Sequence, residues 1–182
     1  MSINGQAVLG IIPARGGSKR VPRKNLRWFR DEPLFYWTAA AAEKSRYIDL
    51  LVVSTEDAEI KELAQALMLE VLDRPAELAT DEASSEDVIR HALTIHKADW
   101  VVLLQLTSPL RLAEDIDACI ERAQMGYGCI SINRATGEHN GAVYVARPEW
   151  LAHHDFSHMG LMKYLMPEER SLDLNTEEDF GA

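Results

Sequence analysis

The chain has 182 residues, of which 47% are hydrophobic, and a formal net charge of −10. This length and composition predict one folded domain, spanning residues 1–182, and exclude a solvated tail. The negative charge disfavours nucleic acid and anionic membranes as partners. No apolar run approaches the roughly 20 residues of a membrane span, and the first residues, MSINGQAV, lack the pattern of a signal peptide. We therefore expect a cytoplasmic protein in which Cys119 and Cys129 are buried thiols.

Short apolar runs alternate along the chain with longer segments of helical periodicity. Continuous apolar runs predict buried strands, whereas apolar residues three and four apart predict helices. The predicted strands are 7–14, 49–55, 69–75, 99–108, 128–133, 141–146 and a short extended piece at 164–167. The predicted helices are 33–45, 56–68, 84–97, 112–124 and a short one at 148–154. The alternation predicts an α/β fold with a mostly parallel sheet and helices on both faces.

The loop after the first strand, PARGGSKRVPRKN, holds the densest positive charge in the chain. Between Arg15 and Arg30 lie seven basic residues and no acidic one. Gly16 and Gly17 allow backbone N–H groups to approach a ligand closely, and ligands of such sheets bind at the carboxyl ends of the strands. Together these features predict a phosphate site. The alternative is a solvated basic surface loop, and the sequence contains neither GxxxxGK[ST] nor GxGxxG.

Six segments, in chain order, resemble motifs of the acylneuraminate cytidylyltransferase family. They are IPARGGSKRVPRKN (12–25), VVSTEDAEI (52–60), RPAELATDEASSEDVI (74–89), LLQLTSPLR (103–111), NGAVYV (140–145) and MPEERSLDLNTEEDF (166–180). The resemblance implies a Rossmann-like three-layer α/β/α nucleotidyltransferase domain that uses CTP and Mg²⁺. The implied reaction transfers CMP from CTP to the C2 hydroxyl of a nonulosonic (sialic-acid-like) sugar acid and releases pyrophosphate.

The resemblance also implies roles for particular residues. The implied nucleotide-binding residues are Arg15, Gly17, Ser18, Lys19, Lys24, Asn25, Arg74 and Ser85. The implied catalytic residues are Arg15, Lys19, Lys24 and Asp173, because a triphosphate needs cations to neutralise its charge during nucleophilic attack. The implied sugar-binding residues are Gln105, Arg111, Asn140 and Tyr144. The implied metal ligands are Asp173 and Asn175, which an extended segment points to the same side.

Simpler interpretations of four of these residues stay open. Arg74 could be a surface ion-pair residue, and Gln105 could be a core amide with its hydrogen bonds satisfied. Arg111 could hold the carboxylate of the substrate or pair locally. Tyr144 could serve core packing as well as substrate binding.

The chain departs from the family pattern in two places. Asn175 stands where the family has the second aspartate of an Asp-x-Asp motif, and a neutral ligand predicts weaker metal binding. The segment near 134–140 is shorter than the dimerisation insert of the family, which leaves a homodimer and the choice of sugar open. Two rival functions follow: a nucleotidyltransferase for another nucleotide or sugar phosphate, and a non-catalytic nucleotide-binding protein.

A histidine cluster near residue 155 lies outside these motifs. His153, His154 and His158 lie close together in the sequence, but no further ligand or HExxH pattern accompanies them. We expect a surface cluster there and no zinc site.

Overall fold

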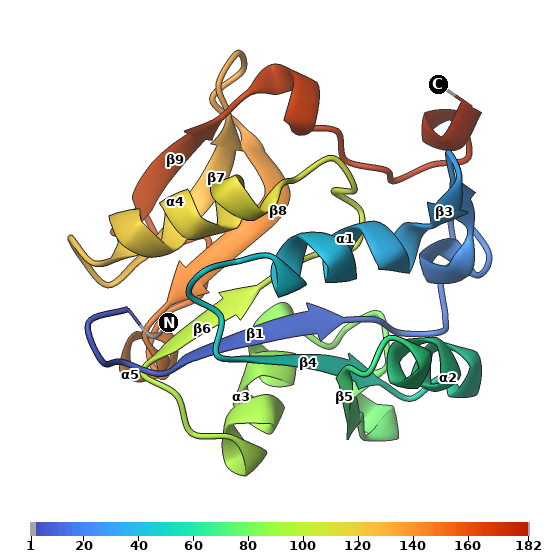
Figure 1. Cartoon of the computed structure of the whole chain (residues 1–182), viewed down its shortest axis with the longest axis horizontal. Coiled ribbons are helices and arrows are strands. Elements are labelled where there is room, and N and C mark those ends of the chain that lie inside the picture. Colours follow the sequence, from blue (N-terminus) through green and yellow to red (C-terminus); the bar gives the residue numbers. More distant parts are fainter. Residues whose placement is uncertain (1–2, 182) are drawn as a thin grey trace.

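The structure is a computed structural model that describes residues 3–181, and it is built on a seven-stranded sheet with the order β5-β4-β1-β6-β8-β7-β9 (Figure 1). The strands are β1 (Val8–Pro13), β4 (Leu50–Thr55), β5 (Glu70–Asp73), β6 (Trp100–Leu103), β7 (Gly128–Asn133), β8 (His139–Ala146) and β9 (Met162–Met166). Two further strands, β2 (Trp28–Phe29) and β3 (Glu32–Pro33), form a separate antiparallel hairpin. The predicted apolar runs thus become strands of one sheet.

Helices cover both faces of the large sheet. The hydrophobic side chains of α1 (Leu34–Glu43), α2 (Ala58–Ala66) and α4 (Ala113–Ala123) pack on one face, and those of α3 (Ser85–Ile95) and α5 (Pro148–Leu151) pack on the other (Figure 1). Four 3-10 helices, η1 (Lys24–Leu26), η2 (Ala76–Leu78), η3 (Glu168–Arg170) and η4 (Glu178–Gly181), complete the helical segments. No helix within residues 3–181 is both long and apolar enough to cross a membrane. The arrangement confirms the predicted three-layer α/β/α fold.

The directions of the strands confirm a mostly parallel sheet. β1 pairs in parallel with β4 and β6, β4 pairs in parallel with β5, and β7 pairs in parallel with β9. Only β8 runs against its neighbours β6 and β7, because a short connection at 134–138 turns the chain back directly after β7. The carboxyl ends of β1, β4, β5 and β6 therefore meet at one edge of the sheet, where they bring together the loops that follow them.

The predicted strand 99–108 is wrong in its second half. β6 ends at Leu103, which is the last residue of the strand that pairs with both β1 and β8. Leu104, whose N–H still donates to the carbonyl oxygen of Ile11 at 3.0 Å, and Leu106 remain buried although they lie in the following loop, so the apolar pattern continues beyond the strand. Gln105 therefore lies in a loop at the carboxyl edge of the sheet, outside the strand.

The hairpin of β2 and β3 begins at the end of the basic segment and has no counterpart in the predicted elements. Arg30 occupies its turn with φ +58°, and the indole N–H of Trp37 in α1 donates to the carbonyl oxygen of Phe29 at 3.0 Å. The C-terminal segment runs beside this hairpin (Figure 1), where Arg27 pairs with Glu177. Residues far apart in sequence thus join at the carboxyl edge.

The two cysteines lie in the core between α4 and β7. Cys119 and Cys129 are both free and fully buried, with their sulfur atoms 3.6 Å apart. Burial raises the pKa of Cys119 well above its ordinary value, so the thiol stays protonated. The prediction of buried thiols is confirmed.

Candidate active site

A cavity of about 520 Å³ lies at the carboxyl edge of the sheet, in front of β1 and β6. Of the residues implied by the sequence motifs, its walls contain Arg15, Gly17, Ser18, Lys19, Lys24, Asn25, Ser85, Gln105 and Asn175. Two smaller hollows adjoin it: one of about 200 Å³ shares Arg15 and Ser85 with the cavity, and one of about 180 Å³ shares Ser85 and Gln105. The three therefore lie side by side at the edge where the fold predicts ligands, and the cations gather in the largest of them.

Acidic groups from the start of α2 hold the backbone of the basic loop in place. The N–H of Gly16 donates to Oε1 of Glu56 at 2.8 Å. Arg23 pairs with Asp57 at 2.5 Å and with Glu59 at 2.9 Å. The side-chain amide of Asn25 donates to the carbonyl oxygen of Arg15 at 2.8 Å, closing the loop on itself. These contacts fix the loop against the β4–α2 connection and leave its other cations at the cavity.

Gly16 and Gly17 differ in the space around them, which gives a matched pair of variants. A Cβ added at Gly16 would lie 2.2 Å from Oδ2 of Asp57, whereas a Cβ at Gly17 would meet nothing within 4 Å. We expect Gly16→Ala to lower the free energy of unfolding by about 1–3 kcal/mol, because the loop must shift away from α2. Gly17→Ala, the control, should change it by less than about 0.5 kcal/mol. Urea unfolding without nucleotide measures both, and equal values for the two variants would contradict this packing.

Lys24, Asp173 and Asn175 lie together where the C-terminal segment passes the basic loop. Nζ of Lys24 donates to the carbonyl oxygen of Leu174 at 3.2 Å, and the amide of Asn175 donates to Oδ2 of Asp173 at 2.8 Å. Burial lowers the pKa of Lys24, and the charge of Asp173 opposes that shift. Oδ1 of Asp173 is buried and has no hydrogen-bond partner among the described residues. The side chains of residues 173 and 175 do lie on one side of the segment, as their alternation predicts.

Arg74 and Ser85 line the hollow of about 200 Å³. Arg74 is only 7% exposed, so it is no surface ion-pair residue. Its guanidinium donates to the hydroxyl of Ser54 at 3.1 Å and to the carbonyl oxygen of Ser54 at 2.7 Å, and burial lowers its pKa. Ser85 is the first residue of α3, so the backbone N–H groups of a helix N-terminus also face this region.

Gln105 and Tyr144 line the hollow of about 180 Å³. Gln105 is half-buried at a cavity wall, which differs from a core amide. Gly141, at φ +70°, brings the backbone of β8 close to this wall: a Cβ there would lie 3.1 Å from Oε1 of Gln105 and 3.9 Å from Oδ2 of Asp173. Burial raises the pKa of Tyr144, and its ring lies 5.0 Å from the ring of Phe156. Tyr144 therefore both packs against Phe156 and faces the hollow.

The side chains of Arg111 and Asn140 face inward, and neither lines these three hollows. Arg111, 2% exposed, donates to the carbonyl oxygens of Gln105 at 3.1 Å and Ala142 at 2.5 Å and to the hydroxyl of Thr38 at 2.6 Å. This geometry favours the local-pairing interpretation of Arg111. The amide of Asn140 is engaged by other protein groups. Its oxygen accepts from the hydroxyl of Ser131 at 2.6 Å and from the N–H of Ala142, and its nitrogen donates to the hydroxyl of Ser171 at 3.0 Å and to the sulfur of Met166.

Several residues at the site have no place among the residues implied by the motifs. Asp81 and Thr107 line the cavity, and Glu86, His139 and Phe156 line the hollow next to Gln105. Asp81 lies in a strongly acidic segment, and its sign opposite to the basic loop is the signal that could have indicated it. The others carry no such signal, because only the folding of distant segments brings them here.

The histidine cluster lies at α5. The ring of His154 stacks on that of Trp150 at 4.8 Å, and the rings of His154 and His158 lie 4.4 Å apart. Within residues 3–181, the structure holds no group of three or more His, Cys, Asp or Glu side chains placed to share a metal ion. The cluster thus packs around an aromatic ring.

A three-layer α/β/α fold with a cation-rich cavity at the carboxyl edge of its sheet is typical of proteins that bind nucleotides. The structure superposes on that of CMP:2-keto-3-deoxy-manno-octonic acid synthetase complexed with CTP with a TM-score of 0.78 and 14% sequence identity, covering 94% of each chain. The sequence model described as "Cytidylyltransferase" matches residues 9–155. The chain belongs to the cytidylyltransferase family, which confirms the resemblance that its motifs indicate.

Two curated relatives show which members of the family the chain is similar to. It is 31% identical to N-acylneuraminate cytidylyltransferase from Escherichia coli, over 95% of this chain and 50% of that protein. It is 40% identical to pseudaminic acid cytidylyltransferase from Campylobacter jejuni, over 59% of this chain and 49% of that protein. The chain therefore spans about half the length of these curated relatives.

Proposed function

We propose that the protein is a cytidylyltransferase that transfers CMP from CTP to the C2 hydroxyl of a nonulosonic sugar acid. One observation carries the proposal: the cavity lined by the basic loop and the hollow beside Tyr144 share Ser85 and Gln105 in their walls, so the two are neighbours. A triphosphate beside the loop and a sugar acid beside Tyr144 would place the two reactants next to each other. Such proximity supplies much of the acceleration of a bimolecular reaction.

The proposed chemistry is an in-line displacement at the α-phosphate of CTP. The C2 hydroxyl oxygen forms a bond to the α-phosphorus and loses its proton to solvent, while the bond to the bridging oxygen of the β-phosphate breaks. Pyrophosphate leaves with that bond's electron pair. Arg15, Lys19 and Lys24 would stabilise the negative charge that builds up on the phosphates, which is the main requirement of this reaction class.

The residues at the C-terminal segment fit a magnesium ion that arrives with the nucleotide. Mg²⁺ is typically held by one or two carboxylates together with phosphate oxygens and water. Asp173 offers a buried, unpartnered carboxylate oxygen, and the side chain of Asn175 lines the cavity beside it and can offer its carbonyl oxygen. When bound, the ion would neutralise part of the phosphate charge. With one carboxylate, the protein itself would hold it weakly.

Asn175→Asp should strengthen this metal site. A second carboxylate raises the charge of the ligand set, so we expect the Mg²⁺ concentration for half-maximal activity to fall roughly tenfold. Without metal, the two carboxylates would repel each other because both are negatively charged, and the present hydrogen bond from Asn175 to Asp173 would be lost. The melting temperature of the variant should therefore rise more with Mg²⁺ than that of the wild type. An unchanged Mg²⁺ requirement would contradict the assignment.

Asn133→Asp is the matched control for that measurement. Asn133 ends β7, and its side-chain oxygen accepts a hydrogen bond from the N–H of Ala135 at 2.8 Å, which an aspartate would keep. The substitution adds the same charge without adding a ligand to the site. It should leave the Mg²⁺ dependence of activity and of melting unchanged.

A panel of sugar acids identifies the substrate. N-acetylneuraminic acid, a pseudaminic acid and a 3-deoxy-manno-octulosonic acid should each be incubated with CTP and Mg²⁺, and the products identified by mass spectrometry. We expect a CMP-sugar from at least one nonulosonic acid. Products only with a sugar phosphate or another nucleotide would support the rival nucleotidyltransferase function. CTP binding with no product from any sugar would support a non-catalytic nucleotide-binding protein.

A further inference from the structure

Asp81 joins two cations of the basic loop through a single carboxylate. Its Oδ1 lies 2.6 Å from Nη2 of Arg15, and its Oδ2 pairs with Nζ of Lys19. The hydrogen bonds from Lys19 and Arg15 hold the pKa of Asp81 below its ordinary value, so the carboxylate is ionised at neutral pH. Each oxygen thus takes one cation, which is how a phosphate group at this place would engage the same pair.

The position of Asp81 makes it a competitor for these cations. Asp81 lines both the cavity of about 520 Å³ and the adjoining hollow of about 200 Å³. The side chain of Arg15 is 33% exposed, that of Lys19 is 82% exposed and that of Asp81 is 31% exposed. Ion pairs with this much solvent contact are weak. An anion with several charges can therefore displace Asp81 without a rearrangement of the core.

We propose that Asp81 is an internal counter-ion that occupies the phosphate place of the nucleotide-free protein and lowers the affinity of the loop for every anion that binds there. A nucleoside triphosphate displaces it because the triphosphate carries about four negative charges against one. When pyrophosphate departs, Asp81 pairs again with Arg15 and Lys19, which favours release of the product. The proposal rests on the proposed function for the identity of the anion, although not for the competition itself.

Whether replacement of Asp81 raises or lowers the affinity for anions distinguishes a competing role of Asp81 from a structural role. If Asp81 only held the loop in shape, its removal would loosen Arg15 and Lys19 and weaken anion binding. If Asp81 competes, its removal strengthens binding. Asp81→Asn keeps the shape of the side chain, and Asp81→Ala removes it entirely. The two variants should agree, and the exposure of Asp81 predicts that both fold.

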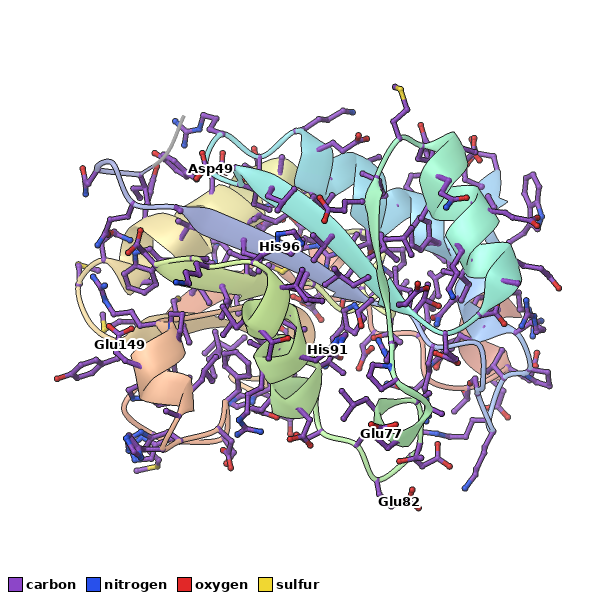
Figure 2. The ribbon with its side chains drawn as sticks, turned by 90° about the horizontal axis from the view of Figure 1, so that it is seen from below. Asp49, Glu77, Glu82, His91, His96 and Glu149 are labelled. Atoms are coloured by element: carbon purple, nitrogen blue, oxygen red, sulfur yellow. The ribbon has the colours of Figure 1, made fainter. Side chains whose placement is uncertain are left out.

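Glu82→Gln is the matched control. Glu82 is the neighbouring acid on the same loop, and it does not line the cavity. Figure 2 shows Glu82 and Glu77 at the margin of the molecule. Glu82→Gln changes the net charge of the protein by the same amount as Asp81→Asn. Any general effect of net charge therefore appears in this variant too.

The test is titration calorimetry of the full chain with inorganic pyrophosphate and with CTP at 0.15 M salt. We expect Asp81→Asn and Asp81→Ala to bind pyrophosphate about three- to tenfold more tightly than the wild type, as the loss of two exposed ion pairs to a competitor predicts. Pyrophosphate should inhibit the variants more strongly by the same factor. Glu82→Gln should differ from the wild type by less than about twofold.

Unchanged or weaker pyrophosphate binding in both Asp81 variants would overturn the proposal. If the wild type binds CTP and the variants bind it no more tightly, only the role of Asp81 fails, and the nucleotide site of the proposed function stands. If neither wild type nor variants bind pyrophosphate or CTP, the cavity is no anion site, and the proposed function fails with it.

Discussion

Lys24→Met should lower kcat/KM for CTP by about two to three orders of magnitude, the size measured when one preorganised group that stabilises developing charge is lost. Lys24 lines the cavity and lies half-buried beside Asp173, with its ammonium held by the carbonyl oxygen of Leu174. Burial keeps water away from this charge and so strengthens its interaction with a phosphate. Methionine keeps an unbranched apolar stem of similar length, so the loss should fall on activity and much less on folding.

Lys97→Met serves as the control for that variant. Lys97 is an exposed residue after α3 and lines none of the three hollows, so its substitution should leave kcat/KM within about twofold. The initial rate of pyrophosphate release at several CTP concentrations gives the comparison, with melting temperatures to verify folding. A Lys24→Met enzyme within threefold of the wild type would remove Lys24 from the proposed mechanism.

The lowered pKa of Lys24 predicts that activity falls as the pH rises. Because burial favours the neutral amine, Lys24 loses its proton at a lower pH than an ordinary lysine. Activity should therefore decline on the alkaline side below the pH at which exposed lysines titrate. Lys24→Arg, which keeps its charge throughout that range, should shift the decline to higher pH. If the activity of the wild type and of Lys24→Arg declined at the same pH, the decline would come from another titrating group.

Arg111→Leu should lower the free energy of unfolding by about 3–5 kcal/mol, because three acceptors lose their donor and each unsatisfied buried group costs about 1–3 kcal/mol. Its guanidinium is the donor for two carbonyl oxygens, those of Gln105 and Ala142, and for the hydroxyl of Thr38. These acceptors would remain buried without that donor. Burial lowers the pKa of Arg111 to about 9, while the charge of Asp115 opposes the shift, so the group is charged at neutral pH.

Urea unfolding at neutral pH measures this loss, with Arg122→Leu as the control. Arg122 is exposed and donates to the carbonyl oxygen of Lys163 at 3.1 Å, so its substitution should cost less than about 1 kcal/mol. The slope of unfolding free energy against urea should stay constant if both variants keep the native fold. Equal costs for the two arginines would show that the Arg111 network contributes little to stability.

The sequence predicted the elements whose signals are local. The continuous apolar run of β1 is buried as a strand, and the helical periodicity of 84–97 becomes α3, with Ser84 as its cap. The clustering of Arg15, Lys19 and Lys24 also followed from local features, because one loop carries all three and the fold rule places that loop at the ligand edge. Their common cavity needed no knowledge of distant residues.

The parts that could not be predicted depend on contacts between distant segments. The apolar side chains of Leu104 and Leu106 extend the strand pattern beyond β6, so the end of that strand was misplaced. Arg111 and Asn140 carry polar groups that the family resemblance assigns to a substrate, yet internal carbonyls, amides and hydroxyls surround them. Asp81 lies between η2 and α3, yet it pairs with Arg15 and Lys19 of the loop that follows β1. Periodicity contains no information on such pairings.

Pyrophosphate release is the most direct test of the central claim that the basic loop binds the triphosphate of CTP for transfer to a sugar acid. The protein should be incubated with Mg²⁺ and CTP, with and without the sugar-acid panel, beside Lys24→Met as the impaired enzyme. We predict release that requires both CTP and a nonulosonic acid and that nearly disappears in the variant. Absence of release, together with no shift of the melting temperature by CTP, would contradict the assignment of residues 11–26 as a triphosphate-binding loop.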